Sequence, residues 1–111
     1  MRTLLPENKI HSEAQKSMTT FHSDVVLAVQ KAISENEWVI VGMAGNPFVR
    51  KAKAHLTNQG VAFSYIEYGS YFSQWKERLA LKLWSGWPTF PQVFHQGIFI
   101  GGFDELKKYR P

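Results

Sequence analysis

Apolar positions recur along the chain with two different spacings, and the change from one to the other predicts the order of helices and strands. Ser23 is a candidate N-cap, and behind it apolar residues repeat at the i, i+3/i+4 spacing of a helix: Val25, Val26, Val29 and Ile33. The next apolar run, 38–41, is continuous and consists of strand formers. Such a run is typical of a strand that is buried on both faces.

A second helix and a second strand follow in the same way. We expect the helix to begin at Pro47 and to end near Gly60, a residue that suits the position after a helix C-terminus. Its spacing predicts three buried side chains, namely Phe48, Ala52 and Leu56. The segment 61–65 reads as the next strand.

The C-terminal half predicts two helices and a hairpin. One helix begins between Ser70 and Ser73 and ends by Gly86, and its apolar stripe consists of Trp75, Leu79 and Leu83. Two short strands, 92–95 and 98–100, are separated by Gln96-Gly97, which is a hairpin signal. Residues 104–110 form a short final helix.

Short strands that alternate with helices and close with a hairpin predict an α/β layer with a small mixed sheet. Residues 1–20 are polar and aperiodic, and we expect them to be a flexible tail. Residues 21–111 contain no linker, repeat or low-complexity segment, so they are predicted to form one domain.

Composition narrows the chemistry. The chain has 111 residues, a net charge of +4 and no cysteine. Without cysteine there is no disulfide, no thiolate metal site and no thiol-disulfide step by a protein sulfur. The positive charge favours an anionic ligand or an acidic partner surface. No apolar run approaches the ~20 residues of a membrane span. We therefore expect a cytoplasmic monomer that does not bind a membrane.

Two motifs near the C-terminus carry the functional signal. Trp87-Pro88-Thr89-Phe90-Pro91-Gln92 is followed at a short distance by Gly101-Gly102-Phe103-Asp104. Together these segments resemble the glutathione-binding half of a glutaredoxin, most closely of the single-cysteine (monothiol) branch. The predicted order of elements is also similar to that family, over roughly residues 23–108. The resemblance implies a thioredoxin-like fold of the glutaredoxin type, with a four-stranded mixed sheet flanked by helices.

The resemblance also implies a set of ligand-binding residues. Phe90-Pro91 matches the residue and cis-proline whose backbone pairs with the cysteinyl part of glutathione. Gly101, Gly102, Phe103 and Asp104 match the turn that holds the γ-glutamyl carboxylate at a helix N-terminus. Arg78 matches an arginine that contacts the glycyl carboxylate, although it also fits a solvated helix face. Trp87 belongs to the tryptophan-proline pair of monothiol members.

The catalytic motif of the family is replaced. Its position is occupied by Asn46-Pro47-Phe48-Val49, so an asparagine stands where the reactive cysteine is expected. Met43 stands where the family has a glutathione-binding lysine. Asparagine before proline is a favourable helix start. The alternatives for Asn46 are thus a structural cap and a contact to a ligand's sulfur or amide.

These observations leave three hypotheses. The first is a protein that binds glutathione or a related γ-glutamyl peptide without its own thiol-disulfide exchange. The second is a glutathione-dependent oxidoreductase or transferase in which the bound glutathione supplies the thiol. The third is a module that docks a protein partner.

Other chemistries have weaker support. The four histidines have no metal-ligand spacing, and an iron-sulfur cluster shared through protein thiolates would lack its cysteine at position 46. We therefore expect no metal site. Aromatic residues near basic ones could stack on bases, but the chain contains no nucleic-acid-binding motif, so this partner class is not expected.

Overall fold

The structure is a computed structural model that describes residues 23–110. The predicted tail at residues 1–20 lies outside the described residues. The elements in chain order are α2 (Ser23–Glu35), β1 (Trp38–Gly42), α3 (Pro47–Asn58), β2 (Ser64–Glu67), α4 (Trp75–Ser85), β3 (Gln92–His95), β4 (Ile98–Gly101) and α5 (Phe103–Lys108).

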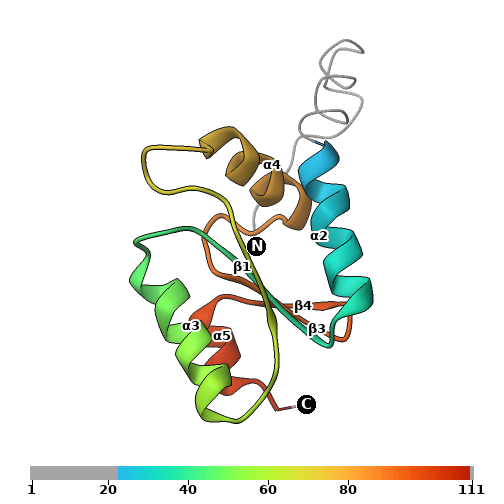
Figure 1. The fold of residues 1–111 in the computed structure, drawn as a ribbon, viewed down its shortest axis with the longest axis vertical. Helices are drawn as coiled ribbons and strands as arrows, with labels where there is room; N and C mark the ends of the chain where they lie inside the picture. The colour runs from blue at the N-terminus through green and yellow to red at the C-terminus, as the bar shows by residue number, and fades with distance from the viewer. Residues whose placement is uncertain (1–22, 111) are drawn as a thin grey trace.

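The four strands form one mixed sheet in the order β2-β1-β3-β4 (Figure 1). β1 pairs in parallel with β2, so that Val39 lies opposite Ser64. The pairs β1–β3 and β3–β4 are antiparallel. The predicted fold class, an α/β fold with a small mixed four-stranded sheet, is therefore confirmed.

β1 is buried along its whole length and contributes to both faces of the sheet. Its side chains alternate between two core clusters, as the period of a strand requires. Val39 and Val41 pack toward α2 and α4, and Trp38 and Ile40 pack toward α3 and α5. The molecule thus consists of a sheet between two pairs of helices (Figure 1), and the continuous apolar run of the sequence is explained.

The C-terminal helix α5 is joined to the sheet through a polar group in the core. His95 is buried, and its Nδ1 lies 2.8 Å from the hydroxyl of Tyr109, just after α5. Its Nε2 lies 3.1 Å from Glu37 Oε2, and its ring stacks on Trp38. Because both ring nitrogens have partners, the buried imidazole is satisfied and the short helix is fixed at the sheet.

The final helix, predicted over 104–110, runs from Phe103 to Lys108. Two predicted starts were also wrong, and local contacts explain both. The second strand begins at Ser64, since pairing with β1 starts there and not at Val61. The third predicted helix begins at Trp75. Ser70 and Ser73 form a turn of their own, in which the Ser73 hydroxyl accepts from the Ser70 N–H at 3.1 Å. Serine side chains compete in this way with the first turn of a helix.

One prediction of burial was wrong, and the predicted apolar stripe on α4 does not face the core. Phe48 is half exposed, and the buried residue at the start of α3 is its neighbour Val49. On α4 the stripe Trp75, Leu79 and Leu83 faces solvent, and the buried residues are Arg78, Ala80 and Leu81. Spacing identified the stripe but could not show which side of the helix meets the sheet.

No helix among residues 23–110 is both long and apolar enough to cross a membrane.

The end of β1 packs closely against α3. A Cβ placed on Gly42 would lie 2.7 Å from Val49 Cγ1 and 3.1 Å from a ring carbon of Tyr65. We expect Gly42→Ala to lower the free energy of unfolding by about 1–3 kcal/mol through overpacking, measured by urea denaturation. In a Val49→Ala background the same change should cost less, because the clashing methyl groups are absent. An equal cost in both backgrounds would contradict this packing.

Candidate functional site

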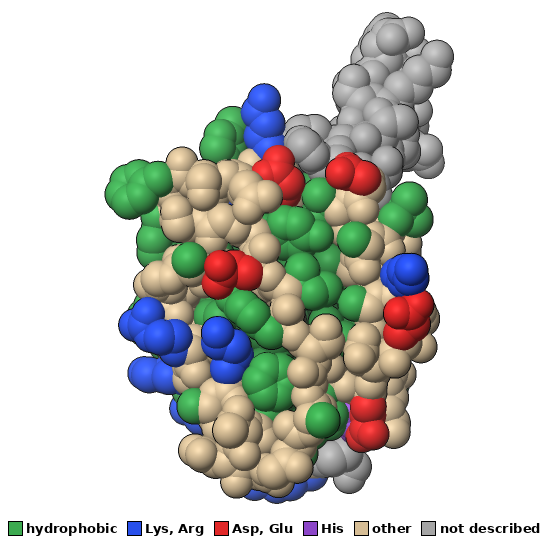
Figure 2. Space-filling model, in the orientation of Figure 1, with side chains coloured by type: hydrophobic (Ala, Val, Ile, Leu, Met, Phe, Trp, Pro, Cys, Tyr) green, Lys and Arg blue, Asp and Glu red, His purple; other side chains and the backbone are tan. Residues whose placement is uncertain are grey.

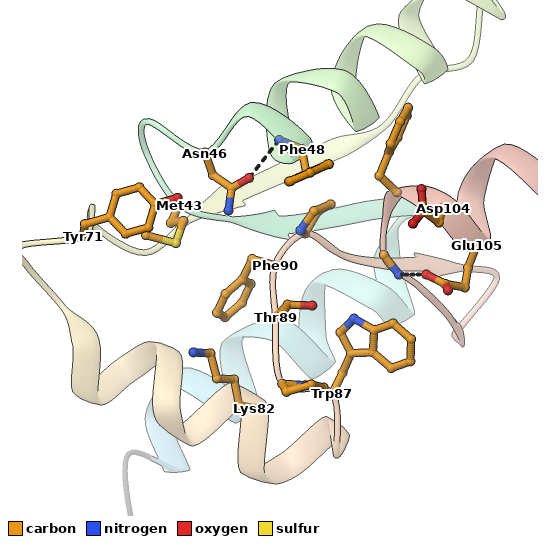
Figure 3. Close-up of a pocket in the computed structure, with 14 residues that line it drawn as sticks. Met43, Asn46, Phe48, Tyr71, Lys82, Trp87, Thr89, Phe90, Asp104 and Glu105 are labelled. Carbon is orange, nitrogen blue, oxygen red and sulfur yellow. Dashed lines mark hydrogen bonds between the residues drawn. The ribbon is translucent and has the colours of Figure 1, made fainter. Parts of the chain in front are cut away.

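A cavity of about 510 Å³ lies where the turn between β1 and α3, α4 and the loop before it, the loop before β3 and the start of α5 meet (Figure 3). Its wall is thus made by segments far apart in the sequence. The lining residues are Met43, Asn46, Phe48, Tyr71, Lys82, Trp87, Pro88, Thr89, Phe90, Pro91, Gly102, Phe103, Asp104 and Glu105.

Asn46 forms one wall and begins α3. Its Oδ1 accepts hydrogen bonds from the N–H groups of Phe48 at 2.9 Å and Val49 at 3.2 Å. This contact satisfies two N–H groups of the first helical turn, and Pro47 follows as a residue with a suitable fixed φ. Because Oδ1 is the acceptor, the amide Nδ2 must point away from the helix. Figure 3 shows it directed toward the cavity.

The loop 87–91 forms the opposite wall. The Phe90–Pro91 peptide bond is cis, as the sequence resemblance implies. Gln92 is fully buried behind the loop, and its Nε2 donates to the carbonyls of Trp87 at 3.2 Å and Thr89 at 3.4 Å. The loop is thus held from behind by a core side chain.

Trp87 has a polar group without a partner. Its indole Nε1 is buried, and no hydrogen-bond acceptor for it is found among the described residues. In Figure 3 this nitrogen is turned toward the cavity. A buried N–H that lacks an acceptor carries a cost of about 1–3 kcal/mol, which a ligand oxygen would remove.

The start of α5 closes one end of the cavity. A Cβ on Gly102 would lie 3.5 Å from Trp87 Nε1 and 3.6 Å from the Pro91 carbonyl oxygen, so glycine lets the two loops approach. The Gly102 N–H donates to Glu105 Oε1 at 2.9 Å. Asp104 and Glu105 bring two carboxylates to this end of the cavity, and Lys107 Nζ lies 3.6 Å from Asp104 Oδ1.

The other end is positive. Among residues 23–110, Lys82 of α4 is the one cation that lines the cavity, and its Nζ lies 5.8 Å from the centre of the Phe90 ring. A charged ligand would therefore find a cation at one end and carboxylates at the other. This arrangement suits a zwitterion that has a carboxylate and an ammonium group far apart.

Arg78 lies elsewhere. Its side chain is 7% exposed, and its guanidinium donates to the carbonyls of Tyr68 at 3.0 Å and of Ser73. It does not line the cavity, and it is not a solvated helix residue either. It fixes the loop before α4 to that helix.

The structure brings most of the sequence-predicted residues together. Those that line the cavity are Asn46, Phe48, Trp87, Phe90, Pro91, Gly102, Phe103 and Asp104, whereas Pro47, Val49, Gly101 and Arg78 do not. Sequence reasoning missed Lys82, Tyr71 and Glu105. Lys82 had a usable signal, because it stands one helical turn after Arg78 and thus on a neighbouring position of the same helix.

Two tyrosines that do not line the cavity have shifted pKa values. Burial raises the pKa of the Tyr65 phenol, and the hydrogen bond that it donates to Glu67 at 2.9 Å raises it further. Burial also raises the pKa of Tyr68, with smaller contributions from the charges of Asp24 and Glu77. Both phenols therefore stay protonated at neutral pH and do not act as bases.

Within residues 23–110 no group of three or more histidine, aspartate or glutamate side chains could hold a metal ion.

Comparisons with known proteins, by sequence and by fold, both find glutaredoxins. The family model Glutaredoxin matches residues 39–100. A glutaredoxin-like protein of Dictyostelium discoideum is 50% identical over 91 residues, which are 82% of this chain and 74% of that protein. Monothiol glutaredoxin-S11 of Oryza sativa subsp. japonica is 34% identical over 87 residues, which are 70% of this chain and only 17% of that protein.

Solved structures agree with this fold. The crystal structure of a buckwheat glutaredoxin-glutathione complex superposes with a TM-score of 0.67 at 21% identity, over 85% of this chain and 82% of that one. A mixed sheet between two helix pairs, with its pocket at a strand-to-helix turn and a cis-proline loop, defines a thioredoxin-fold domain. Within that fold the chain belongs to the glutaredoxin family, and it is a member without cysteine in which Asn46 and Val49 replace the active-site motif.

The cap at Asn46 predicts a measurable contribution to stability. Asn46→Ala removes the acceptor of two N–H groups and should lower the free energy of unfolding by about 1 kcal/mol. Asn46→Asp keeps the acceptor and adds a favourable charge at the helix N-terminus, so it should cost little or nothing. Urea denaturation of the two variants checks this. Equal stability of Asn46→Ala and the parent would show that the cap is dispensable.

Proposed function

We propose that this protein binds glutathione or a related γ-glutamyl peptide in the cavity and performs no thiol-disulfide exchange with a residue of its own. The observation that carries the proposal is the buried indole N–H of Trp87, which faces the cavity without an acceptor among the described residues. A carboxylate or peptide oxygen of the ligand would satisfy it. The chain has no cysteine, so the sulfur of any thiol chemistry belongs to the ligand.

The distribution of charge supports the same ligand class. Glutathione has two carboxylates and one ammonium group. Lys82 would attract a carboxylate at one end, and at the other the ammonium group would compete with Lys107 for the carboxylate of Asp104. The backbone at Phe90-Pro91 and Gly101-Gly102 would hold the peptide between them. Asn46 Nδ2 would face the ligand sulfur.

Two features limit the affinity. Glu105 already accepts from the Gly102 N–H, so a ligand carboxylate would compete with a protein carboxylate for this donor. Met43, which is buried and lines the cavity, supplies no charge where the family has a lysine. The buckwheat complex shows that a protein of this fold holds glutathione, and these two differences imply weaker binding here.

A second candidate is a glutathione-dependent enzyme in which the bound glutathione supplies the thiol. The orientation of Asn46 favours it, because an amide N–H directed into the cavity could stabilise a thiolate by donating to the sulfur. It requires turnover of a glutathione mixed-disulfide substrate above the protein-free rate. A rate equal to that control would eliminate it.

Titration of reduced glutathione into isotopically labelled protein tests the binding proposal. We expect saturable backbone amide shifts at Phe90, Gly102, Phe103 and Asp104. Lys82→Gln should weaken binding about 3–10-fold, the effect of losing one partly exposed charge contact of about 1 kcal/mol.

Lys76→Gln is the matched control for this titration. Lys76 is also on α4 but is exposed and does not line the cavity, so its replacement should leave the affinity unchanged. Unshifted amides up to millimolar glutathione would refute the proposal.

Restoring the sulfur tests whether the rest of the site is intact. The Asn46→Cys thiolate should attack oxidised glutathione, form a mixed disulfide and release one reduced glutathione, and the variant should acquire measurable oxidoreductase activity, since the helix N-terminus would lower the pKa of the new thiol. Ala62→Cys, an exposed position away from the cavity, is the control and should show only background activity. Equal activity of the two variants would mean that the cavity does not position glutathione for reaction.

A further inference from the structure

Exposed aromatic rings gather on two segments that meet at the cavity. Phe48 lies in the first turn of α3, whereas Tyr71, Phe72 and Trp75 lie on the loop before α4 and at its start. Phe48 is 51% exposed and Phe72 is 97% exposed. Phe48 and Tyr71 both line the cavity, so the two segments are neighbours in space. Large side chains exposed together mark an interaction surface.

The same two segments are positively charged. Arg50 and Lys51 are exposed on α3, which contains no acidic residue, and Lys76 is exposed on α4. Between residues 68 and 85 the one acidic residue is Glu77. Figure 2 shows both groups along one edge of the molecule: hydrophobic side chains project at its top left, and Lys and Arg side chains gather below them over α3. We call this the basic–aromatic surface, and its residues are Phe48, Arg50, Lys51, Tyr71, Phe72, Trp75 and Lys76.

Two of the cations lie beside rings of this surface. Lys51 Nζ is 5.2 Å from the centre of the Phe48 ring, and Lys76 Nζ is 5.7 Å from the centre of the Trp75 ring. A partner that covers a ring therefore has to bring negative charge close to it. Single-stranded nucleic acid does this at every position, since each nucleotide consists of a flat base and a phosphate. Exposed rings beside basic side chains are how proteins bind such strands without reading their sequence.

Other occupants fit the basic–aromatic surface less well. A second copy of this chain would bring the same cations against each other. In a double helix the faces of the bases are covered by their neighbours, so the exposed rings would have nothing to stack on. An acidic polypeptide would match the charge, but its carboxylates would leave the rings of Phe72 and Trp75 uncovered.

We propose that the basic–aromatic surface binds single-stranded nucleic acid. Bases would stack on Phe72 and Trp75, and phosphates would be held by Arg50, Lys51 and Lys76. None of these five side chains lines the cavity, so the inference does not depend on glutathione binding. The sequence shows no motif for this partner, because the surface is assembled from two segments that only the fold brings together.

Fluorescence titration of the full chain with an oligothymidylate of about 12 nucleotides tests this inference. Trp75 is 59% exposed, and a base stacked on it should quench its emission, an effect that Trp75→Phe should abolish. Three phosphate contacts should make the logarithm of the affinity fall against the logarithm of the salt concentration with a slope of about −2. Absence of quenching at low salt, or a slope near zero, would overturn the proposal.

Charge variants examine the phosphate contacts. Lys51→Gln should weaken binding about 5–10-fold at about 50 mM salt and should make the salt slope shallower by about 0.7. Lys31→Gln is the matched control, since Lys31 is also exposed but lies on α2, which packs on the other side of the sheet from α3. Equal effects of the two substitutions would show that the strand responds only to the net charge of the protein.

Ring variants separate base stacking from a general apolar contact. Phe72→Leu keeps an apolar side chain but removes the flat ring, and it should lower the affinity about fivefold or more. Phe72→Trp keeps a ring and should retain the affinity. Phe72 is almost fully exposed, so both variants should fold like the parent, which thermal unfolding checks. Full retention of affinity in Phe72→Leu would refute stacking at this position.

Three further results would refute the proposal. Equal affinity for a duplex of the same length would mean that the bases are not contacted. Equal affinity for polyglutamate would show that the surface takes an acidic polypeptide. A dimer in sedimentation that Phe72→Ser dissociates would assign the surface to a second copy of the chain.

Discussion

The burial of β1 on both faces is the constraint on which the site depends. β1 pairs with β2 on one side and β3 on the other, and its side chains alternate between the two core clusters. The strand therefore has one position and one register, because a slip of one residue would exchange its two faces. The turn at its end is fixed in consequence. Asn46 and the loop 87–91 then face each other across a cavity that neither segment could form alone.

Although the cysteine is absent, the backbone N–H groups at the start of α3 still have a hydrogen-bond acceptor at position 46. In a protein with a cysteine here, the first N–H groups of the helix stabilise a thiolate. In this chain Asn46 accepts from two of them. The replacement thus converts a reactive position into a structural cap, while the cis-proline loop and the Trp87 indole still face the cavity. At such a turn the shape of the binding site can be kept while the reactive thiol is lost.

The sequence predicted those parts of the structure that depend on local pattern. The β1 run, the start of α3 at Pro47 and the hairpin β3–β4 are where spacing and turn residues placed them. Much of the cavity lining was expected because two compact motifs resemble those of glutaredoxins, whereas Tyr71, Lys82 and Glu105 were not. Errors arose where the fold orients a helix. Nothing local showed that α4 buries Arg78 and exposes Trp75, since the buried guanidinium depends on carbonyl groups in a loop.

That buried guanidinium bears on how firmly the loop beside the cavity is held. Arg78 donates to the carbonyls of Tyr68 and Ser73, so the loop that carries Tyr71 and Phe72 is closed around a charge. Opening the loop would take both carbonyl acceptors away from the guanidinium, which opposes such a motion. The loop is thus tied to α4 by one side chain that bridges its two ends.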